Sequence, residues 1–376
     1  MFDIALGAFL FLSPIIFLFG NNARINGTIA ALGFYQFKTL SLENNIIQLQ
    51  FFQYGIVILF IIALMQKPIR YFQDKYLAYF LGLCGLSVFI YPKTLTAFIL
   101  IFLGCLFYYL IVGYAKNIKK LLYIIAGVSI LNTFFAILQF FNIYLFYNPP
   151  ENMTICGMMF SPSHLGTYQA LALPICYMIN PYLAIIPLIG LLLAKSITPI
   201  LAGIVGIIYL LFPKKKRIFI NLAPMGLIAS LGIFIILLIG NFKTIFCKFA
   251  MRFELWVNVL KEIIKRSLTG FGLGTFPELS SKIYSYQGHW KWIYNEYLSI
   301  AFYIGILGLF PVIIFLKNKF NGIGVGLERA IATSCLIIAI ICLGQPAMHF
   351  PRLAGTIIPL FAFLEILKRK EGVPLK

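Results

Sequence analysis

Acidic residues are scarce in this 376-residue chain, which has 11 Asp and Glu against 30 Lys and Arg. No Asp-x-Asp motif occurs among them, so paired carboxylates that hold a divalent cation are not expected, and we predict no metal site. The seven cysteines contain no Cys-x-x-Cys pair, which argues against a zinc or thiol redox centre. No organic cofactor is indicated either.

Charged side chains of any kind are also few, at 11% of the residues, whereas 61% are hydrophobic and the mean hydropathy is +0.95. This composition excludes an ordinary soluble domain and indicates an integral membrane protein. The formal charge of +19 would otherwise indicate nucleic acid as a partner. Here the basic residues stand in short clusters between apolar runs of bilayer-crossing length, so we expect a lipid bilayer and no nucleic acid.

Twelve apolar runs between Ile4 and Leu367 predict an all-α, polytopic protein with about 12 transmembrane spans and both termini in the cytoplasm. The run Tyr182–Ala194 has only 13 residues and fits a re-entrant or broken helix equally well. With this topology, 16 basic residues fall on the cytoplasmic side, in five groups: Lys67, Arg70 and Lys75; Lys116, Lys119 and Lys120; Lys214–Arg217; Lys317 and Lys319; and Lys368, Arg369, Lys370 and Lys376.

The predicted topology divides the chain into three parts. Residues 1–240 hold the first nine spans, 241–295 form one large external loop, and 296–376 hold the last three spans and a cytoplasmic tail. The loop carries eight basic residues, which a long translocated segment tolerates. The predicted topology places all three histidines on the external side of the membrane. Two explanations stay open: the histidines form a polar site there, or histidine is simply excluded from the lipid-facing spans. The sequence leaves open whether Cys156 and Cys247, both in segments predicted to be external, form a disulfide.

An amphipathic helix is predicted within the external loop, because apolar residues recur every three or four positions. The opposite side is basic, which is typical of an anchor at the lipid phosphates. Gly270, Gly272 and Gly274 should end this helix, and their backbone fits an anion nest better than a nucleotide loop, whose flanking strand is missing. The apolar positions are Phe249, Phe253, Trp256, Leu260, Ile263 or Ile264, and Leu268.

Polar Asn295 and ionisable Glu296 stand where the loop enters the next span. Burial of such groups at a membrane boundary is costly unless they are paired or used. The chain around them resembles the O-antigen ligases and Wzy-type O-antigen polymerases. The residues that carry the resemblance are Arg252 with Trp256; Gly270, Gly272 and Gly274; Asn295 with Gly305 and Gly308; and, upstream, Phe160–Gly166 followed by Leu171–Pro174.

The resemblance implies a GT-C-like glycosyltransferase in the inner (cytoplasmic) membrane of a bacterial cell, with its active site facing the periplasm or exterior. Such an enzyme moves a saccharide from a polyprenyl (undecaprenyl) diphosphate carrier to a hydroxyl of an acceptor glycan or lipid A-core, in polysaccharide or lipopolysaccharide biosynthesis. The chemistry needs compensation of the departing diphosphate charge and a base for the acceptor hydroxyl.

Residue roles follow from the same resemblance. Arg252 is expected to bind the diphosphate, since an arginine fork pairs with phosphate oxygens. The family has a histidine directly before its Asn, where this chain has Tyr294. The base is then His289, five residues earlier, or else His164 or His349, with Tyr294 as a hydrogen-bonding partner. The remaining substrate-binding candidates are Lys195, Arg266, Arg352, Asn295, Glu296, Gly272 and Gly274.

Other functions compete with this interpretation. A glycan transporter or flippase would hold its substrate at broken spans such as Ile197–Phe212, with Thr198 and Pro199. A catalytically inactive relative would bind lipid diphosphate, and a scaffold or sensor would bind anionic lipids through the basic outer helix. The polar residues collect outside the spans, which favours the enzyme.

Overall fold

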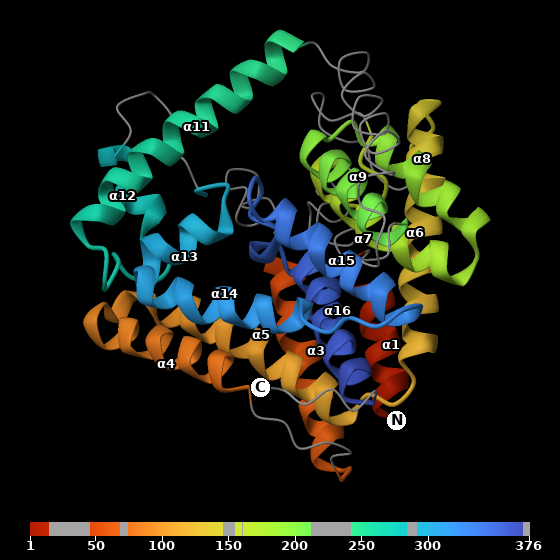
Figure 1. The fold of residues 1–376 in the computed structure, drawn as a ribbon, viewed down its shortest axis with the longest axis horizontal. Helices are drawn as coiled ribbons and strands as arrows, with labels where there is room; N and C mark the ends of the chain where they lie inside the picture. The colour runs from red at the N-terminus through yellow and green to blue at the C-terminus, as the bar shows by residue number, and fades with distance from the viewer. Residues whose placement is uncertain are drawn as a thin grey trace, which may run out of the picture.

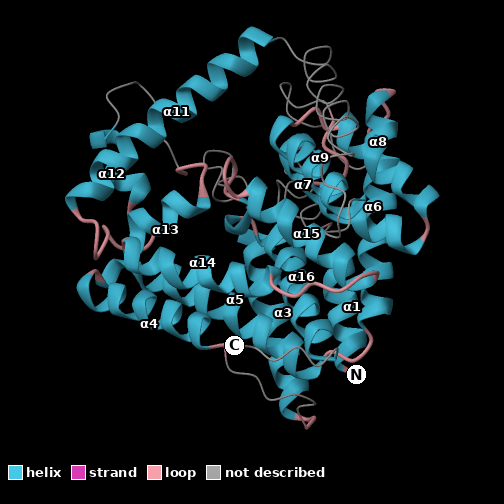
Figure 2. Cartoon of the chain, viewed as in Figure 1, coloured by secondary structure: helices cyan, strands magenta, loops and turns pink. Residues whose placement is uncertain are grey.

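The computed structural model describes residues 1–14, 46–67, 74–145, 155–159, 161–211, 242–283 and 292–370. Within these ranges the chain is α-helical and contains no strand, as predicted (Figure 2). Several predicted features lie outside the described residues: the segment Gly20–Asn45, the ninth span Ile218–Gly240 and His289. The side chain of Cys247 also lies outside them, so the structure does not test its pairing with Cys156.

Five helices stand side by side as the central bundle (Figure 1). Phe9 anchors the bundle core, with its ring centre 5.1 Å from that of Phe107 and 6.0 Å from that of Phe52. Two further helices, α4 (Lys75–Ile90) and α14 (Ile306–Phe320), pack against each other crosswise to the bundle. The helices of the central bundle are α1 (Phe2–Leu12), α3 (Ile46–Leu64), α5 (Leu95–Tyr114), α6 (Ile118–Phe140) and α16 (Pro351–Lys370).

A second group of helices surrounds α7 (Pro162–Ile179), which is buried along most of its length. Small residues permit the close packing of this group: a Cβ at Gly206 would collide with Ile337, and one at Gly190 would collide with Gln169. The helices that pack on α7 are α8 (Ile185–Leu193), α9 (Ile197–Leu211) and α15 (Leu327–Ile341).

The segment predicted to be external forms the predicted amphipathic helix, α11 (Phe242–Lys265), followed by α12 (Phe276–Ile283). α11 packs on α13 (Glu296–Ile304) through a buried face of Leu255, Val259 and Ile263. The apolar face predicted from the sequence is therefore divided. Four of its members are exposed and leave a second, uncovered apolar stripe along α11: Phe253 (56%), Leu260 (45%), Ile264 (75%) and Leu268 (62%).

Glycine ends two of these helices. Gly270, Gly272 and Gly274 follow α11 with φ of 66°, 98° and 73°, the left-handed region that glycine adopts without strain. The apolar run Glu296–Leu316, which the predicted topology counts as the tenth span, is not one helix, because Gly305 (φ 82°) divides it into α13 and α14. The Ile306 amide donates to the Ser267 carbonyl at 2.8 Å, so the break closes onto the segment that follows α11.

Two helices of the described chain are long and apolar enough to cross a membrane. They are Pro92–Tyr114 and Ile118–Phe140, with mean hydropathies of 2.5 and 2.2. The other apolar helices are shorter; α4 has 16 residues, α9 has 15, and the run at Tyr182 becomes a 3-10 turn, η6 (Pro181–Ala184), followed by the 9-residue α8. The full set of 12 spans therefore stays a prediction.

Groups predicted to be cytoplasmic meet at one end of the bundle, where α1 begins and α16 ends (Figure 1). Asp3 accepts hydrogen bonds from the backbone amides of Lys116 and Asn117, each at 3.0 Å. Lys319 Nζ lies 2.6 Å from Glu365 and 3.6 Å from Asp74. α16 has 20 residues and is therefore about 30 Å long, close to the hydrocarbon thickness of a bilayer. Its first residues lie at the opposite end of the molecule.

The buried Lys319–Glu365 pair yields a stability prediction. Glu365→Gln should lower the free energy of unfolding by about 3 kcal/mol or more, because Lys319 would stay buried with only the more distant Asp74 as a counter-charge. Thermal unfolding of the purified protein in detergent measures this. The control is Lys265→Ala, which removes an exposed ion pair and should cost about 0.5 kcal/mol or less. Equal unfolding temperatures for the two variants would contradict the prediction.

Candidate functional site

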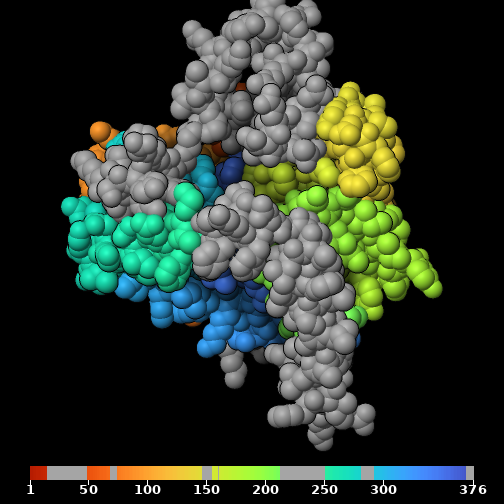
Figure 3. Space-filling model, turned by 90° about the horizontal axis from the view of Figure 1, so that it is seen from above, coloured from red at the N-terminus to blue at the C-terminus, as the bar shows by residue number. Residues whose placement is uncertain are grey.

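The candidate site lies at the end of the bundle opposite the two termini, where four segments meet. They are α11, residues 292–295 before α13, residues 342–350 between α15 and α16, and the first turn of α7. Seen from this end, α11 (teal) and the helices α8 and α9 (green) lie on opposite sides of the molecule (Figure 3). Seven of the predicted residues come together here: Arg252, Tyr294, Asn295, Glu296, His164, His349 and Arg352.

Arg252 connects α11 to the other segments. Its Nη1 donates to the Gly344 carbonyl at 2.9 Å, and its Cζ lies 4.7 Å from the centre of the Tyr294 ring, a cation–π contact. One turn later, Trp256 Nε1 donates to the Ile293 carbonyl at 2.8 Å. The spacing of four residues therefore places both side chains on the same segment. Burial lowers the pKa of Arg252, but a guanidinium remains charged at neutral pH.

The turn into α13 presents Glu296 to the site. Tyr294 has a φ of 57°, a conformation that costs a non-glycine residue of the order of 1 kcal/mol and that accumulates at functional sites. Asn295 caps the helix, its Oδ1 accepting from the Leu298 amide at 3.0 Å. The Glu296 amide donates to the Cys342 carbonyl at 2.8 Å, which joins α13 to the 342–350 segment.

Glu296 and His349 form the central pair of the site. Nδ1 of the histidine lies 3.2 Å from Oε1 and 3.1 Å from Oε2, and Oε1 also accepts from the Met348 amide at 2.8 Å. Burial by itself lowers the pKa of His349, but the charge and hydrogen bond of Glu296 outweigh it, so the pKa is raised above its ordinary value. Because Nδ1 is engaged, Nε2 is the nitrogen left to meet a substrate.

His164 lies beside this pair at the start of α7 and is 8% exposed. Its ring centre is 4.1 Å from that of Phe350, and among the described residues its Nδ1 has no hydrogen-bond partner. Arg352, on the first turn of α16, donates from Nη1 to the Met159 carbonyl. The two cations therefore come from different helices: Arg252 contacts Gly344 and Tyr294, in the two segments that carry His349 and Glu296, and Arg352 lies three residues after His349 in the chain.

Two amide side chains of α6 support this arrangement, and the sequence analysis missed both. Gln139 Oε1 accepts from the amides of Cys156 and Gly157, each at 2.8 Å, and Asn132 Oδ1 accepts from the Met158 amide at 3.0 Å. They hold residues 155–159, which carry the carbonyl that binds Arg352. The signal in the sequence was the occurrence of amide side chains within a long apolar run.

Four predicted residues lie apart from this cluster. Arg266 follows Arg252 by 14 residues, about 21 Å along a helix axis, and donates to the Tyr91 hydroxyl at 2.6 Å. The Gly272 amide donates to the Tyr303 carbonyl at 2.9 Å and is not available to an anion; Gly274 is exposed beside it. Lys195 is exposed at the turn between α8 and α9, where the Oγ of the next residue, Ser196, lies 3.4 Å from the Oγ of Ser163.

No family model matches the chain, and no curated protein matches it. The functional interpretation therefore depends on the arrangement of side chains and on the motifs described above. Within the described residues, no three His, Cys, Asp or Glu side chains converge as a metal site would require.

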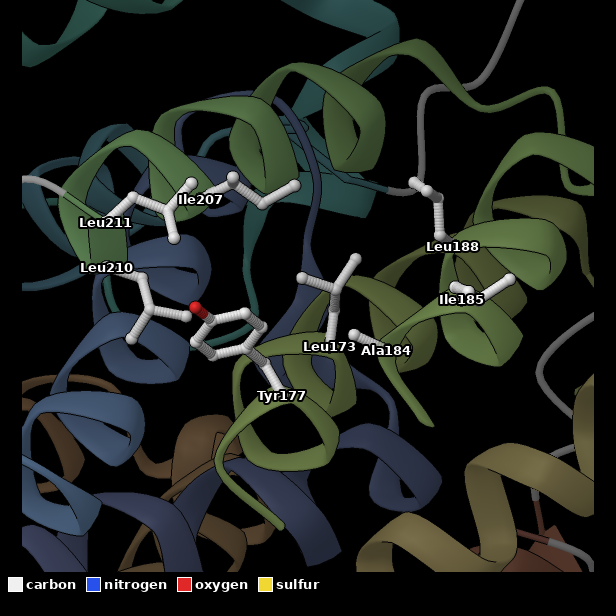
Figure 4. Close-up of a pocket in the computed structure, with 8 residues that line it drawn as sticks. All are labelled: Leu173, Tyr177, Ala184, Ile185, Leu188, Ile207, Leu210 and Leu211. Carbon is white, nitrogen blue, oxygen red and sulfur yellow. The ribbon is translucent and has the colours of Figure 1, made fainter. Parts of the chain in front are cut away.

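An apolar cavity of about 140 Å³ lies elsewhere, between α7, η6, α8 and α9 (Figure 4). Tyr177 supplies the one hydroxyl of its lining, and this residue is 13 positions after His164, about 20 Å along a helix axis. The cavity has no charged side chain and so cannot move a proton or bind a diphosphate. Its other lining residues are Leu173, Ala184, Ile185, Leu188, Ile207, Leu210 and Leu211.

Proposed function

We propose that this protein is a membrane glycosyltransferase of the O-antigen ligase or polymerase type. It transfers a saccharide from a polyprenyl diphosphate carrier to a hydroxyl of an acceptor glycan or lipid A-core. The observation that carries the proposal is the Glu296–His349 pair, a carboxylate-oriented imidazole, on segments to which Arg252 and Arg352 also belong or bind. A base next to an anion-binding pair is what this transfer needs.

In the proposed reaction, Nε2 of His349 accepts the proton of the acceptor hydroxyl. The oxygen attacks the anomeric carbon of the donor sugar and forms the new glycosidic bond. The bond from that carbon to the diphosphate oxygen breaks, and its electron pair leaves with the diphosphate. Arg252 uses one N–H for the Gly344 carbonyl and keeps others for phosphate oxygens, and Arg352 adds a second positive charge.

His349 takes the role of base in place of His289, the first choice of the sequence analysis. Tyr294 stands at the family's histidine position, but a phenol is a poorer general base than an imidazole. Its ring instead faces the Arg252 guanidinium. His349 brings an imidazole to the same turn from the other side, 53 residues later in the chain than Glu296.

The proposal places the protein in the inner membrane of a bacterial cell, with the site on the periplasmic or outer face. Two helices of membrane-crossing length support a membrane location. The separation of the basic end from the site end by a helix about 30 Å long supports the orientation, since basic clusters favour the cytoplasmic side. At the middle of the described span Ile118–Phe140 the buried polar side chains are neutral, with Ser129 bonded to Gln169 and Thr133 bonded to the Ile186 carbonyl, whereas the candidate site carries charged groups, which favours the enzyme over the transporter.

A deletion strain tests the biological role. Loss of the whole surface polysaccharide, restored by the wild-type gene, is expected for a ligase, and survival of chains with a single repeat is expected for a polymerase. An unchanged glycan profile would contradict both.

The pH dependence of transfer should report the Glu296–His349 pair. The base acts when neutral, so kcat/KM should rise with pH through the raised pKa of His349. In Glu296→Gln the charge that raises this pKa is removed, so the rise should move to lower pH, and the plateau should fall because the ring is oriented less well. A pH–rate profile of the two proteins measures this. An unchanged position of the rise would exclude the pair as the titrating unit.

A further inference from the structure

The indole of Trp292 lies beside the proposed base. It is half-buried, its ring centre is 4.5 Å from that of His349, and the two planes are inclined by 59°. Phe350 extends the same aromatic surface, with 6.2 Å between its ring centre and that of Trp292. Since Glu296 holds Nδ1 of the same histidine, the substrate-facing Nε2 and this surface belong to one connected group.

An anchor in the lipid interface is the ordinary role of tryptophan at a membrane boundary. Here the indole packs instead on His349, the last residue of η7 (Ala347–His349), and on Phe350, the one residue between η7 and α16. Its position thus points to a ligand of the site and not to lipid.

An aromatic face has a particular chemical preference. It carries partial negative charge, and it attracts the C–H groups of a sugar ring, which neighbouring oxygens make partly positive. A flat, stiff indole also loses little conformational entropy when it binds. A pyranose that lies on such a face projects its hydroxyls sideways, toward groups at the edge of the platform. At Trp292 the neighbouring polar group is His349, whose ring centre is 4.5 Å from that of the indole.

We propose that Trp292 and Phe350 form the acceptor subsite, and that the acceptor is a pyranose whose C–H face lies on the indole while one hydroxyl reaches Nε2 of His349. This inference rests on the proposed transferase function and adds to it the class and orientation of the acceptor. It assigns Trp292 to acceptor binding, distinct from the donor-binding role of Arg252.

Acceptor kinetics test the proposal in the reconstituted full-length protein. At saturating donor, Trp292→Ala should raise the acceptor KM roughly tenfold or more, leave the donor KM unchanged, and be largely rescued in Trp292→Phe. Tyr182→Ala, which removes an 80% exposed aromatic residue on η6, is the control and should match wild type. An unchanged acceptor KM in Trp292→Ala, or equal rises in both KM values, would overturn the assignment.

A binding measurement separates this inference from the transferase proposal. Tryptophan fluorescence of the wild-type protein should respond saturably to methyl β-D-glucopyranoside, whose ring faces are lined by C–H groups. It should not respond to D-glucitol, which has hydroxyls but no ring. The response should disappear in Trp292→Phe. Response to both compounds, no response to either, or a response that persists in Trp292→Phe would contradict sugar binding at Trp292, even if the wild-type protein catalyses transfer. A saturable response of Trp292 in a protein that catalyses no transfer would leave sugar binding at Trp292 standing and would contradict only the transferase function.

Discussion

Replacing His349 with alanine is expected to lower the rate of glycan transfer by about 10²- to 10⁴-fold, the range for loss of a general base. The imidazole is the one group of the described site that combines a raised pKa with an orienting carboxylate. Donor binding should change little, because the arginines remain. The measurement is kcat at saturating donor and acceptor with the purified protein.

His349→Gln is the matched control for folding, since glutamine keeps a side chain able to hydrogen-bond to Glu296. It should unfold at a temperature close to that of wild type and be nearly as inactive as His349→Ala. His289→Ala and His164→Ala should retain more activity than either. If His289→Ala abolished transfer while His349→Ala preserved it, the base would be the loop histidine and the present assignment would be wrong.

Arg252→Ala should reduce kcat by about 10²- to 10³-fold, as loss of one group that stabilises developing charge does in other enzymes. Arg252→Lys should be nearly as severe. Lysine keeps the charge, but it loses the planar fork that binds the Gly344 carbonyl, stacks on Tyr294 and still reaches phosphate oxygens. Transfer assayed over a range of donor concentrations separates the effect on kcat from that on KM.

Arg266 offers the control on the same segment. It is exposed, follows the end of α11, and donates to Tyr91 away from the cluster. Arg266→Ala should therefore retain most activity, although the sequence analysis gave both arginines a role at the substrate. Equal losses for the two alanine variants would show that the basic loop acts through its total charge. Activity of Arg252→Lys close to wild type would show the same.

Some parts of this structure could be predicted from local patterns in the sequence. α11 and its end follow from a repeat of apolar residues and from three glycines, all within one stretch of chain. The division of its apolar face was not predictable from that repeat, because Leu255, Val259 and Ile263 are buried only by contact with α13. The break at Gly305 likewise depends on the Ser267 carbonyl, which lies 39 residues before the Ile306 amide that binds it.

The candidate site shows the same limit. Arg252, Asn295 and Glu296 stood out by residue type and motif, and the structure brings them together. His349 was one of three candidate bases, and the sequence could not show that it is the partner of Glu296, because the two residues are 53 positions apart and only the fold decides which histidine reaches the carboxylate. Gln139 holds the 155–159 segment from a distance of 17 or 18 residues, and no period in the sequence encodes that contact.

The basic groups predicted to be cytoplasmic come from distant parts of the chain. Those near Lys75, Lys116, Lys319 and Lys368 meet at one end of the helices, and the side of a membrane that this end faces stays a prediction. Their individual partners could not be predicted, since Lys319 reaches Asp74 on one side and Glu365 on the other through tertiary packing.

The most direct test of the central claim is transfer by the purified protein in proteoliposomes that contain a polyprenyl diphosphate-linked oligosaccharide and an acceptor glycan. The account predicts a new glycosidic product and release of polyprenyl diphosphate with the wild-type protein, and loss of both with His349→Ala. Movement of the intact lipid-linked oligosaccharide across the bilayer, with no glycosidic product, would contradict the account and establish a transporter.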